Sequence, residues 1–555
     1  MAAKQNELVF LPLGGVGEIG MNLALYGYGP SNAREWIIVD CGVTFPGPDL
    51  PGADLVMPDI GFIEGELERL HGIVITHAHE DHYGALLALW PRLKAPVWAT
   101  PFTAGLLEAK RGSEDGDVKV PVTIYNAGDR FEVGPFKVEA VTVTHSIPEP
   151  VALAITSPAG TVIHTGDWKI DHAPALGDKT DEKRFRELGE AGVLALICDS
   201  TNAMRDGVSP SEEEVGESLR GLIEKAPGRV AVTTFSSNVG RLRSITEAAR
   251  DAGRKVLVLG RSIKRVIDVA DELGYMQGLP EFLEEEDFAY VARDEVVILC
   301  TGSQGESRAA LAKLARDELR DVSLDAGDTV IYSSRVIPGN EKAIIEIKNQ
   351  LIDRGIRIIE DDDALVHVSG HPRRNELEQM YAWTRPEISV PVHGEAAHLV
   401  AHGSLASTLG VPQVAQIRNG DMLRLAPGAA EIITRVESGR IFKDGYLIGS
   451  YDKVGIRERK KLSYVGHVAV NVVLDDRHEL AGDPDLISIG LPREDAGGAD
   501  MDELLLDAAI GAIESIPRAR RKDLDLVAEA ARRAVRSAAN DVWGKKPVVT
   551  VFVTR

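Results

Sequence analysis

The 555-residue sequence has few cysteines and no long hydrophobic run. Its three cysteines, Cys41, Cys198 and Cys300, lie in or beside apolar segments and form no CxxC motif. They indicate small core side chains in a reducing compartment, so we expect a cytoplasmic protein. No stretch approaches the roughly eighteen apolar residues of a membrane helix. The N-terminal segment lacks the apolar core of a signal peptide, so we expect no membrane association.

Positive charge is also scarce, because 62 Lys and Arg residues face 85 Asp and Glu residues and give a formal net charge of −23. This balance argues against a protein that coats nucleic acid through bulk electrostatics. It does not exclude a nucleic-acid enzyme with a local basic groove. The length predicts about two to four domains.

Short apolar strands alternate with glycine-containing turns through residues 1–205, which predicts a layered α/β domain. From 206 to 368 strands alternate with amphipathic helices, which predicts an inserted α/β domain with a parallel sheet covered on both faces. Shorter strands return over 369–450, where we expect the first domain to resume. The polar segment 451–461 is a predicted linker. Residues 462–555 form a predicted small α/β unit without catalytic spacing.

The segment THAHEDHYGA, residues 76–85, follows an apolar strand and is rich in imidazole and carboxylate groups. Such groups need partners when buried, so a core rarely contains this many. His77 and His79 can reach one ion together, while Asp81 and His82 reach a second position once the chain turns into a helix. A lone histidine of this kind is more often structural, but the cluster favours two zinc ions. Further ligands are expected at other strand ends, with the candidates His145, Asp167 and His393.

The HAHEDH motif, with Asp40 before it and the three later candidates after it, resembles the metallo-β-lactamase superfamily. The resemblance implies an αββα sandwich, a fold that hosts lactamases, thioesterases, lactonases and nucleases. It implies that one zinc ion is held by His77, His79 and His145. It implies that the other is held by Asp81, His82 and His393, with Asp167 bridging the two. Asp40 would orient a ligand histidine through a hydrogen bond.

The whole predicted inserted domain lies between Asp167 and His393, an arrangement that resembles the β-CASP nucleases. Motifs A, B and C of that group match Asp199, His371 and His393. Within the group the chain is similar to the bacterial ribonuclease J family. The matching segments are GGVGEIGMN, THAHEDH, THSIPE, GDWKID, FSSNVGR, TGSQGE, IPGNE and HVSGHPRR. The small C-terminal unit also fits the layout of this family.

This resemblance implies a ribonuclease that acts in rRNA processing and mRNA decay. It implies hydrolysis of phosphodiester bonds by water activated by two zinc ions per subunit, with manganese as an alternative ion. The expected substrate is single-stranded RNA with a 5′ monophosphate, cut by a 5′-to-3′ exonuclease that also has endonuclease activity. A homodimer or homotetramer is expected.

Three residues are expected to be catalytic, namely His371, Asp199 and Asp81. His371, positioned by Asp199, is the expected proton donor to the leaving 3′ oxygen. The alternative is that His371 only binds phosphate. Asp81 is expected to be essential through its metal.

The HVSGH segment combines a hydroxyl, a glycine backbone and two imidazoles, which suits a phosphate cradle. Its residues are His367, Val368, Ser369, Gly370 and His371. Ser237 and Asn238 precede a predicted helix and are expected to donate to the same phosphate. The alternative for them is a plain helix N-cap. Six basic residues are candidates for an RNA groove: Arg241, Lys264, Arg265, Arg335, Arg373 and Arg374.

Two other classes of function stay open. One is another hydrolase of the same fold. A small-molecule ester or thioester hydrolase would not explain the inserted domain, and the ribonuclease J-like motifs argue against a DNA nuclease. The other is a non-enzymatic scaffold subunit of an RNA-processing complex. Such a subunit would have lost ligands, whereas this sequence keeps every predicted ligand position.

Overall fold

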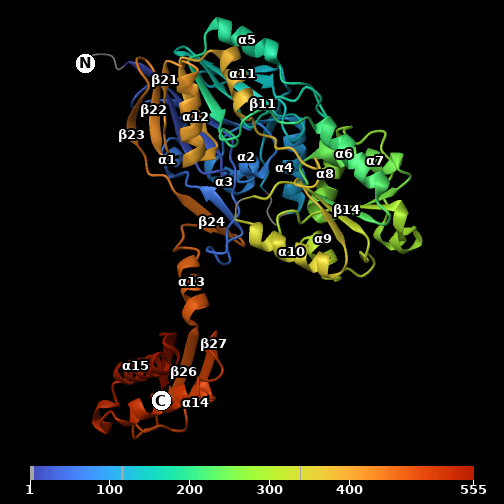
Figure 1. Ribbon diagram of the computed structural model, residues 1–555. Coiled ribbons are helices and arrows are strands. Elements are labelled where there is room, and N and C mark those ends of the chain that lie inside the picture. The colour runs from blue at the N-terminus through green and yellow to red at the C-terminus, as the bar shows by residue number, and fades with distance from the viewer. Residues whose placement is uncertain (1–4, 114–117, 338) are drawn as a thin grey trace. The chain divides into compact units, whose positions relative to one another are not determined.

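The computed structural model describes residues 5–113, 118–337 and 339–555 and divides into two compact units (Figure 1). Unit 1 comprises residues 1–44 and 56–440, and unit 2 comprises residues 45–55 and 441–555. Within the described ranges, no helix has both the length and the apolar character needed to cross a membrane.

Two sheets packed face to face form the larger part of unit 1. The first has eight strands, in the order β23 (Glu431–Arg435), β22 (Asp421–Ala426), β1 (Asn6–Gly14), β3 (Leu23–Pro30), β4 (Glu35–Val39), β6 (Leu70–Val74), β7 (Val97–Ala99) and β8 (Val122–Ile124). The second has seven, in the order β21 (Gln413–Val414), β19 (Ile388–Val392), β13 (Ala195–Asp199), β12 (Gly160–His164), β11 (Val151–Ser157), β10 (Phe136–Thr142) and β9 (Arg130–Val133). Alternate residues such as Phe10 of β1 and Leu153 of β11 point into the shared core.

Helices cover the outer faces of both sheets (Figure 1). The helices next to the first sheet are α1 (Gly61–Glu64), α2 (Glu80–Tyr83), α3 (Leu86–Leu93) and α4 (Pro101–Ser113). Phe62 of α1 meets Trp36 of β4 edge-on. The second sheet is covered by α5 (Glu182–Ala191), α11 (Arg374–Thr384) and α12 (Ala396–Thr408), through apolar residues such as Phe185, Leu377 and Leu405. This layering confirms the predicted αββα sandwich.

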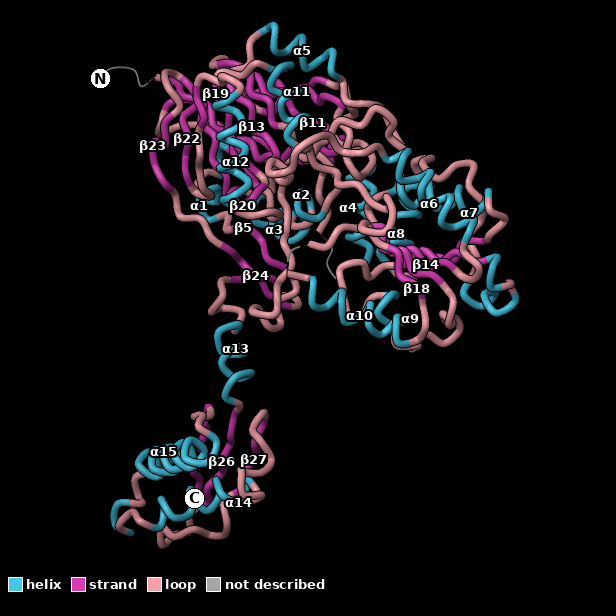
Figure 2. Tube along the Cα trace, viewed as in Figure 1, coloured by secondary structure: helices cyan, strands magenta, loops and turns pink. Residues whose placement is uncertain are grey.

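An insertion between β13 and β19 forms a separate five-stranded sheet. Its order is β15 (Lys255–Leu259), β16 (Val296–Cys300), β14 (Val230–Thr234), β17 (Thr329–Ser333) and β18 (Arg357–Ile359). Every neighbouring pair is parallel, as the strand–helix alternation predicts. The helices around this sheet are α6 (Glu212–Lys225), α7 (Val239–Asp251), α8 (Arg261–Glu272), α9 (Ala310–Ala315) and α10 (Glu341–Asp353). In Figure 2, α6 and α7 lie on one side of the sheet and α9 and α10 on the other.

Unit 2 contains a three-stranded sheet in the order β27 (Asp485–Ile489), β26 (His467–Val473) and β28 (Val548–Thr554). One face packs on α14 (Met501–Glu514) and α15 (Leu524–Trp543), as the sequence pattern predicts. The predicted linker 451–461 is partly helical, because α13 (Ile456–Val465) begins after Gly455 and ends before Gly466. Its Arg, Glu, Lys and Leu side chains are good helix formers.

Residues 45–55 group with unit 2, although the sequence places them in the first domain. The Asp54 amide donates to the Lys443 carbonyl at 2.8 Å, and the Asp54 carboxylate accepts the Gly445 amide at 2.7 Å. These bonds join segments nearly four hundred residues apart in the chain. No local pattern could have predicted them.

Candidate metal centre

The predicted ligands come together in unit 1 from the ends of strands in both sheets of the sandwich. His77 and His79 lie in the turn between β6 and α2, which is followed by Asp81 and His82 in α2. The others follow strands: His145 after β10, Asp167 after β12, and His393 after β19. The parallel pairs β4–β6 and β13–β19 direct their carboxyl ends to the same edge. This edge is where the sequence predicted the chemistry.

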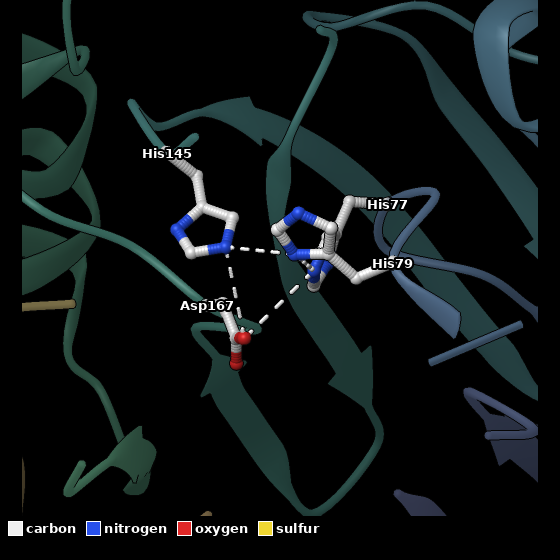
Figure 3. A group of neighbouring side chains, drawn as sticks. All are labelled: His77, His79, His145 and Asp167. Atoms are coloured by element: carbon white, nitrogen blue, oxygen red, sulfur yellow. Dashed lines mark hydrogen bonds and ion pairs between the residues drawn. The ribbon is translucent and has the colours of Figure 1, made fainter. Parts of the chain in front are cut away.

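One group of ligand atoms consists of His77, His79, His145 and Asp167, all within 4.8 Å of one another (Figure 3). His79 Nδ1 lies 3.1 Å from His77 Nε2 and 3.0 Å from His145 Nε2. Asp167 Oδ2 lies 3.8 Å from His77 Nε2 and 3.7 Å from His145 Nε2. The three ring nitrogens and the carboxylate oxygen thus face one point.

A second group consists of Asp81, His82, Asp167 and His393, again within 4.8 Å. Asp167 Oδ2 lies 3.2 Å from His82 Nε2 and 3.5 Å from His393 Nε2. Asp81 Oδ2 lies 3.7 Å from His82 Nε2 and 3.8 Å from His393 Nε2. The same oxygen of Asp167 therefore belongs to both groups, as a bridging carboxylate requires.

The outer nitrogens of the rings show which inner nitrogens are free to bind a metal. His82 Nδ1 donates to Asp40 at 2.7 Å, His145 Nδ1 to the Gly370 carbonyl at 2.6 Å, and His393 Nδ1 to Asn22 Oδ1 at 2.9 Å. All three partners are acceptors, so each Nδ1 carries a proton and Nε2 is the nitrogen that faces the ligand group.

Asp167 supplies a second indication of a cation. Its Oδ1 is buried and has no hydrogen-bond partner among the described residues. A buried carboxylate oxygen without a donor is costly, and the histidine nitrogens crowd around the other oxygen of the same carboxylate, Oδ2. Nitrogen and carboxylate donors in this arrangement are suited to zinc or a similar divalent ion.

The histidines differ in protonation. Burial lowers the pKa of His79 to about 4 and that of His77 well below its usual value, so both are neutral and able to coordinate. Burial also disfavours the charged form of His82, but nearby Asp167, Asp81 and Asp40 outweigh it and hold its pKa well above the usual value. His82 must therefore release a proton when it binds an ion.

Asp40 connects two ligand histidines from a strained backbone position, with φ of 64° directly after β4. It accepts from the Thr76 amide at 2.8 Å as well as from His82. The Thr76 hydroxyl donates to Asp40 and accepts from His77 Nδ1 at 3.0 Å. Thr76 was missed by sequence reasoning, and so was Asn22, which also donates to the Asp81 carbonyl at 3.0 Å. Common polar residues such as these carry no signal of their own.

His371 and Asp199 form a pair beside the centre. His371 Nδ1 donates to Asp199 Oδ2 at 2.7 Å and lies 3.9 Å from Asp167 Oδ2. Burial opposes the charged imidazole, but Asp199, followed by Asp167 and Asp81, raises the pKa of His371 to about 9. His371 is therefore poised to carry a proton, with its Nε2 not used by Asp199.

The HVSGH segment lies against the centre through Gly370. A side chain there would place Cβ 2.5 Å from His145 Cε1, so only glycine allows the carbonyl to reach His145. The Ser369 hydroxyl accepts from Asn202 at 2.9 Å, another residue without a sequence signal. His367 has a buried Nδ1 without a hydrogen-bond partner in the described ranges. Val368 is buried.

Ser237 and Asn238 lie between β14 and α7, next to the HVSGH segment. The ring of Phe235, which follows β14, lies 6.3 Å from that of His367. Asn238 is the N-cap of α7, since its Oδ1 accepts from the Arg241 amide at 2.9 Å. The N-cap interpretation is therefore correct for Asn238, although its amide nitrogen is not used in this bond.

The expectation that Arg241 lines an RNA groove is wrong. Its side chain is 0% exposed and pairs with Glu212 at 2.7 Å, so it cannot touch a substrate at the surface. Lys264 pairs with Glu285 at 3.0 Å on the surface of the inserted domain. Arg335 and Arg373 remain close to the HVSGH segment, and Arg335 donates to Asn202 at 3.1 Å.

Four family models match the chain. Residues 35–210 match the beta-lactamase superfamily domain, and residues 227–351 the beta-CASP domain of ribonuclease J. Residues 363–415 match the Zn-dependent metallo-hydrolase RNA specificity domain, and residues 454–555 the ribonuclease J C-terminal domain.

Whole proteins match as well. The chain is 64% identical over 553 residues to a ribonuclease J of Sinorhizobium meliloti, covering 100% of this chain and 98% of the relative. A ribonuclease J of Mycolicibacterium smegmatis is 38% identical, with 98% and 96% covered. A solved structure of a protein of unknown function from Enterococcus faecalis shares the fold, with a TM-score of 0.51 at 15% identity, over 75% of this chain and 100% of that chain. The full-length matches and the metal-binding geometry together show that the chain belongs to the ribonuclease J family.

Proposed function

We propose that this chain hydrolyses single-stranded RNA at a centre of two zinc ions, with manganese as an alternative. It acts as a 5′-to-3′ exonuclease on RNA with a 5′ monophosphate and also cuts internally, in rRNA processing and mRNA decay. The observation that carries the proposal is the His371–Asp199 pair, which lies beside the carboxylate oxygen shared by both ligand groups. Three free, buried cysteines support a cytoplasmic setting.

In this proposal His77, His79 and His145 would hold one ion and Asp81, His82 and His393 the other, with Asp167 available to both. When bound, the ions would activate water and offset negative charge on the phosphate. Asp40, Asn22 and the Gly370 carbonyl keep three of the rings in their binding orientation. His371, held by Asp199, gives its proton to the leaving 3′ oxygen, which departs poorly without one.

A cluster of arginines supports phosphate binding beside the HVSGH segment. Burial and the nearby Arg205 and Arg373 lower the pKa of Arg335. Burial and Arg373 likewise lower the pKa of Arg205, a residue that sequence reasoning missed. Neighbouring guanidinium groups repel one another, and an anion bound between them stabilises their charged forms. We place the 5′ monophosphate here, with the HVSGH backbone, Ser237, Asn238 and the N-terminus of α7 as further donors.

This placement gives a test with one RNA labelled at either end and carrying a 5′ monophosphate, triphosphate or hydroxyl. The monophosphate should fix the register and release mononucleotides from the 5′ end, while the bulkier triphosphate should leave only slower internal cuts. Arg335→Gln should lower kcat/KM on monophosphorylated RNA by about tenfold, because a charge-assisted hydrogen bond is lost. Digestion from the 3′ end, or indifference to the 5′ group, would show that the pocket is misassigned.

A matched control is Arg320→Gln, because the Arg320 side chain is 93% exposed and its pair with Asp321 is long, at 3.8 Å. Its kcat/KM should equal that of the unchanged chain on all three RNAs. A similar loss in both variants would mean that overall charge, not a local site, governs the preference.

We also propose that the chain forms a homodimer or homotetramer through unit 2. The sheet face opposite α14 and α15 exposes Ile487, Ile489 and Phe552 by 64%, 67% and 59%. The register places Ile487 and Ile489 opposite Ala469 and His467, so they share one apolar face. Such a face on a small unit indicates a protein interface.

Ile489→Lys combined with Phe552→Lys should shift the chain toward the monomer in sedimentation equilibrium, because two charges would be buried in the contact. Arg533→Ala, in an exposed side chain of α15, should leave the molecular mass unchanged. A monomeric unchanged chain, or a double variant of unchanged mass, would exclude this interface.

A further inference from the structure

A buried carboxylate outside the metal centre, Glu376, joins the two segments that carry the proposed catalytic groups. Glu376 lies in the first turn of α11 and is 0% exposed. Its Oε1 accepts the Ile170 amide at 2.8 Å. Its Oε2 accepts the Arg373 amide, the Ser209 amide and the Ser209 hydroxyl, each at 2.9 Å. The two oxygens thus bind donors from three separate parts of the chain.

Two of these donors lie two or three residues after a proposed ligand or catalytic residue in the sequence. Ile170 follows the shared ligand Asp167, and Arg373 follows His371. The segment that contains Ile170 is also hydrogen-bonded to the one that contains His145, since the Lys169 amide donates to the Thr144 carbonyl at 2.8 Å. Glu376 therefore links the backbone of the metal ligands to the backbone of the proposed acid.

The other end of the HVSGH segment is tied to the same place by a second buried group. Arg241 Nη1 donates to the Val366 carbonyl at 3.0 Å, and the guanidinium pairs with Glu212 at 2.7 Å. The Glu212 amide in turn donates to Asp171 at 2.9 Å. Residues 366–373 are thus held at both ends to residues 167–171.

A simpler role for Glu376 is to cap α11, because its bond to the Arg373 amide is part of a capping box. That role accounts for one of the four bonds. Ile170 and Ser209 belong to segments that precede α11 by more than 160 residues, as their separations of 206 and 167 show. A carboxylate needed only as a cap would not require these donors.

We infer that Glu376 is a positioning residue for His371. It fixes the HVSGH segment relative to Asp167, so that the imidazole stands at a set place over the reacting phosphate. This inference rests on the proposed acid role of His371. It adds a residue that touches neither metal nor RNA.

The test is Glu376→Gln, which keeps the shape but turns one acceptor oxygen into an amide NH2 that cannot accept a hydrogen bond. The segment of Ile170 or that of Arg373 then loses its hydrogen bond to residue 376. We expect kcat to fall by about tenfold to a hundredfold, as when other residues that orient a functional side chain without touching the substrate are changed. Metal content and KM should be unchanged. Glu378→Gln, an exposed residue of the same helix, is the matched control and should have normal kcat.

A double-mutant cycle separates positioning from general damage. If Glu376 acts through His371, Glu376→Gln should cause no further loss once His371→Ala is present. The single variant should also recover on RNA with a 3′-bridging sulfur, a leaving group that needs no proton. An equal fold-loss in both backgrounds, or a loss of metal in Glu376→Gln, would overturn the inference.

The outcomes also distinguish this inference from the proposed function. Full activity of His371→Ala would overturn the acid role itself, and the inference with it. Low activity of His371→Ala with an additive Glu376 effect would overturn only the inference. Should Glu376→Gln fail to fold, Ser209→Ala removes just the hydroxyl donor, and its smaller loss in kcat must likewise vanish in the His371→Ala background.

Discussion

Asp167→Asn is expected to abolish RNA hydrolysis, with a loss in kcat of about a thousandfold or more, because several kcal/mol of metal-derived stabilisation is removed. The oxygen that the variant alters lies within 3.2 to 3.8 Å of four histidine nitrogens. Asparagine keeps the size of the side chain but loses the negative charge that both ions would share. Metal content, measured by elemental analysis, should fall together with activity.

Asp81→Ala should differ from Asp167→Asn in the number of metal ions bound per chain, since Asp81 belongs to one ligand group and Asp167 to two. It should also abolish cleavage, but it should retain more metal than Asp167→Asn. A control is Asp178→Asn, an exposed position in the loop that follows Asp167, which should leave both activity and metal content unchanged. Thermal unfolding should show that all three variants are folded. An active Asp167→Asn enzyme, or an active chain nearly free of metal, would contradict the two-metal mechanism.

His371→Ala is expected to lower kcat by about a hundredfold to ten-thousandfold with normal metal content, the range for loss of a general acid. The imidazole lies 2.7 Å from Asp199 and 3.9 Å from Asp167, close enough to serve a phosphate at the centre. RNA with a 3′-bridging sulfur should recover much of the loss, because thiolate leaves without a proton. An equal loss on both substrates would assign His371 to phosphate binding.

The pH profile gives a second measurement of this role. A general acid acts while protonated, so kcat should fall as pH rises through the pKa of His371. Asp199 raises that pKa to about 9, with burial opposing it, and bound cations would lower it from there. Asp199→Asn should move the alkaline limb to lower pH, and His371→Ala should remove it. A limb that stays in place in both variants must belong to another group.

The two groups of candidate ligands could be predicted to lie together from the sequence, because their chemistry is concentrated and their positions are regular. Imidazole and carboxylate groups crowd into THAHEDH, and Asp167 and His393 follow the ends of apolar strands within three residues. Parallel strands bring such ends to one edge of a sheet. The residues that orient the rings could not be predicted in this way. Asn22 and Thr76 are common polar residues, and their roles depend on partners far away in the chain.

Packing explains the remaining differences. Strand β3 has a weak signal in the sequence, because Gly27 and Gly29 interrupt its apolar pattern. A Cβ at Gly27 would lie 2.5 Å from the ring of Trp36, so the glycine makes room for the indole on the neighbouring strand. Arg241 was misplaced for a similar reason. Its basic side chain suggests a groove, but the side chain is buried and bonds to Glu212 and Val366. One of these partners precedes Arg241 in the sequence and the other follows it.

The chain order of the centre has a consequence for synthesis on the ribosome. The first ligands, from His77 to Asp167, emerge early, but His371 and His393 follow only after the whole inserted domain. The strand β22 that pairs with β1 comes later still. A chain that ends within the inserted domain carries six of the seven candidate ligands but lacks His393, and it also lacks His371, the proposed proton donor. We therefore expect products terminated within the inserted domain to be inactive as nucleases, so that a nascent chain should not cut the messenger from which it is translated before this domain is complete.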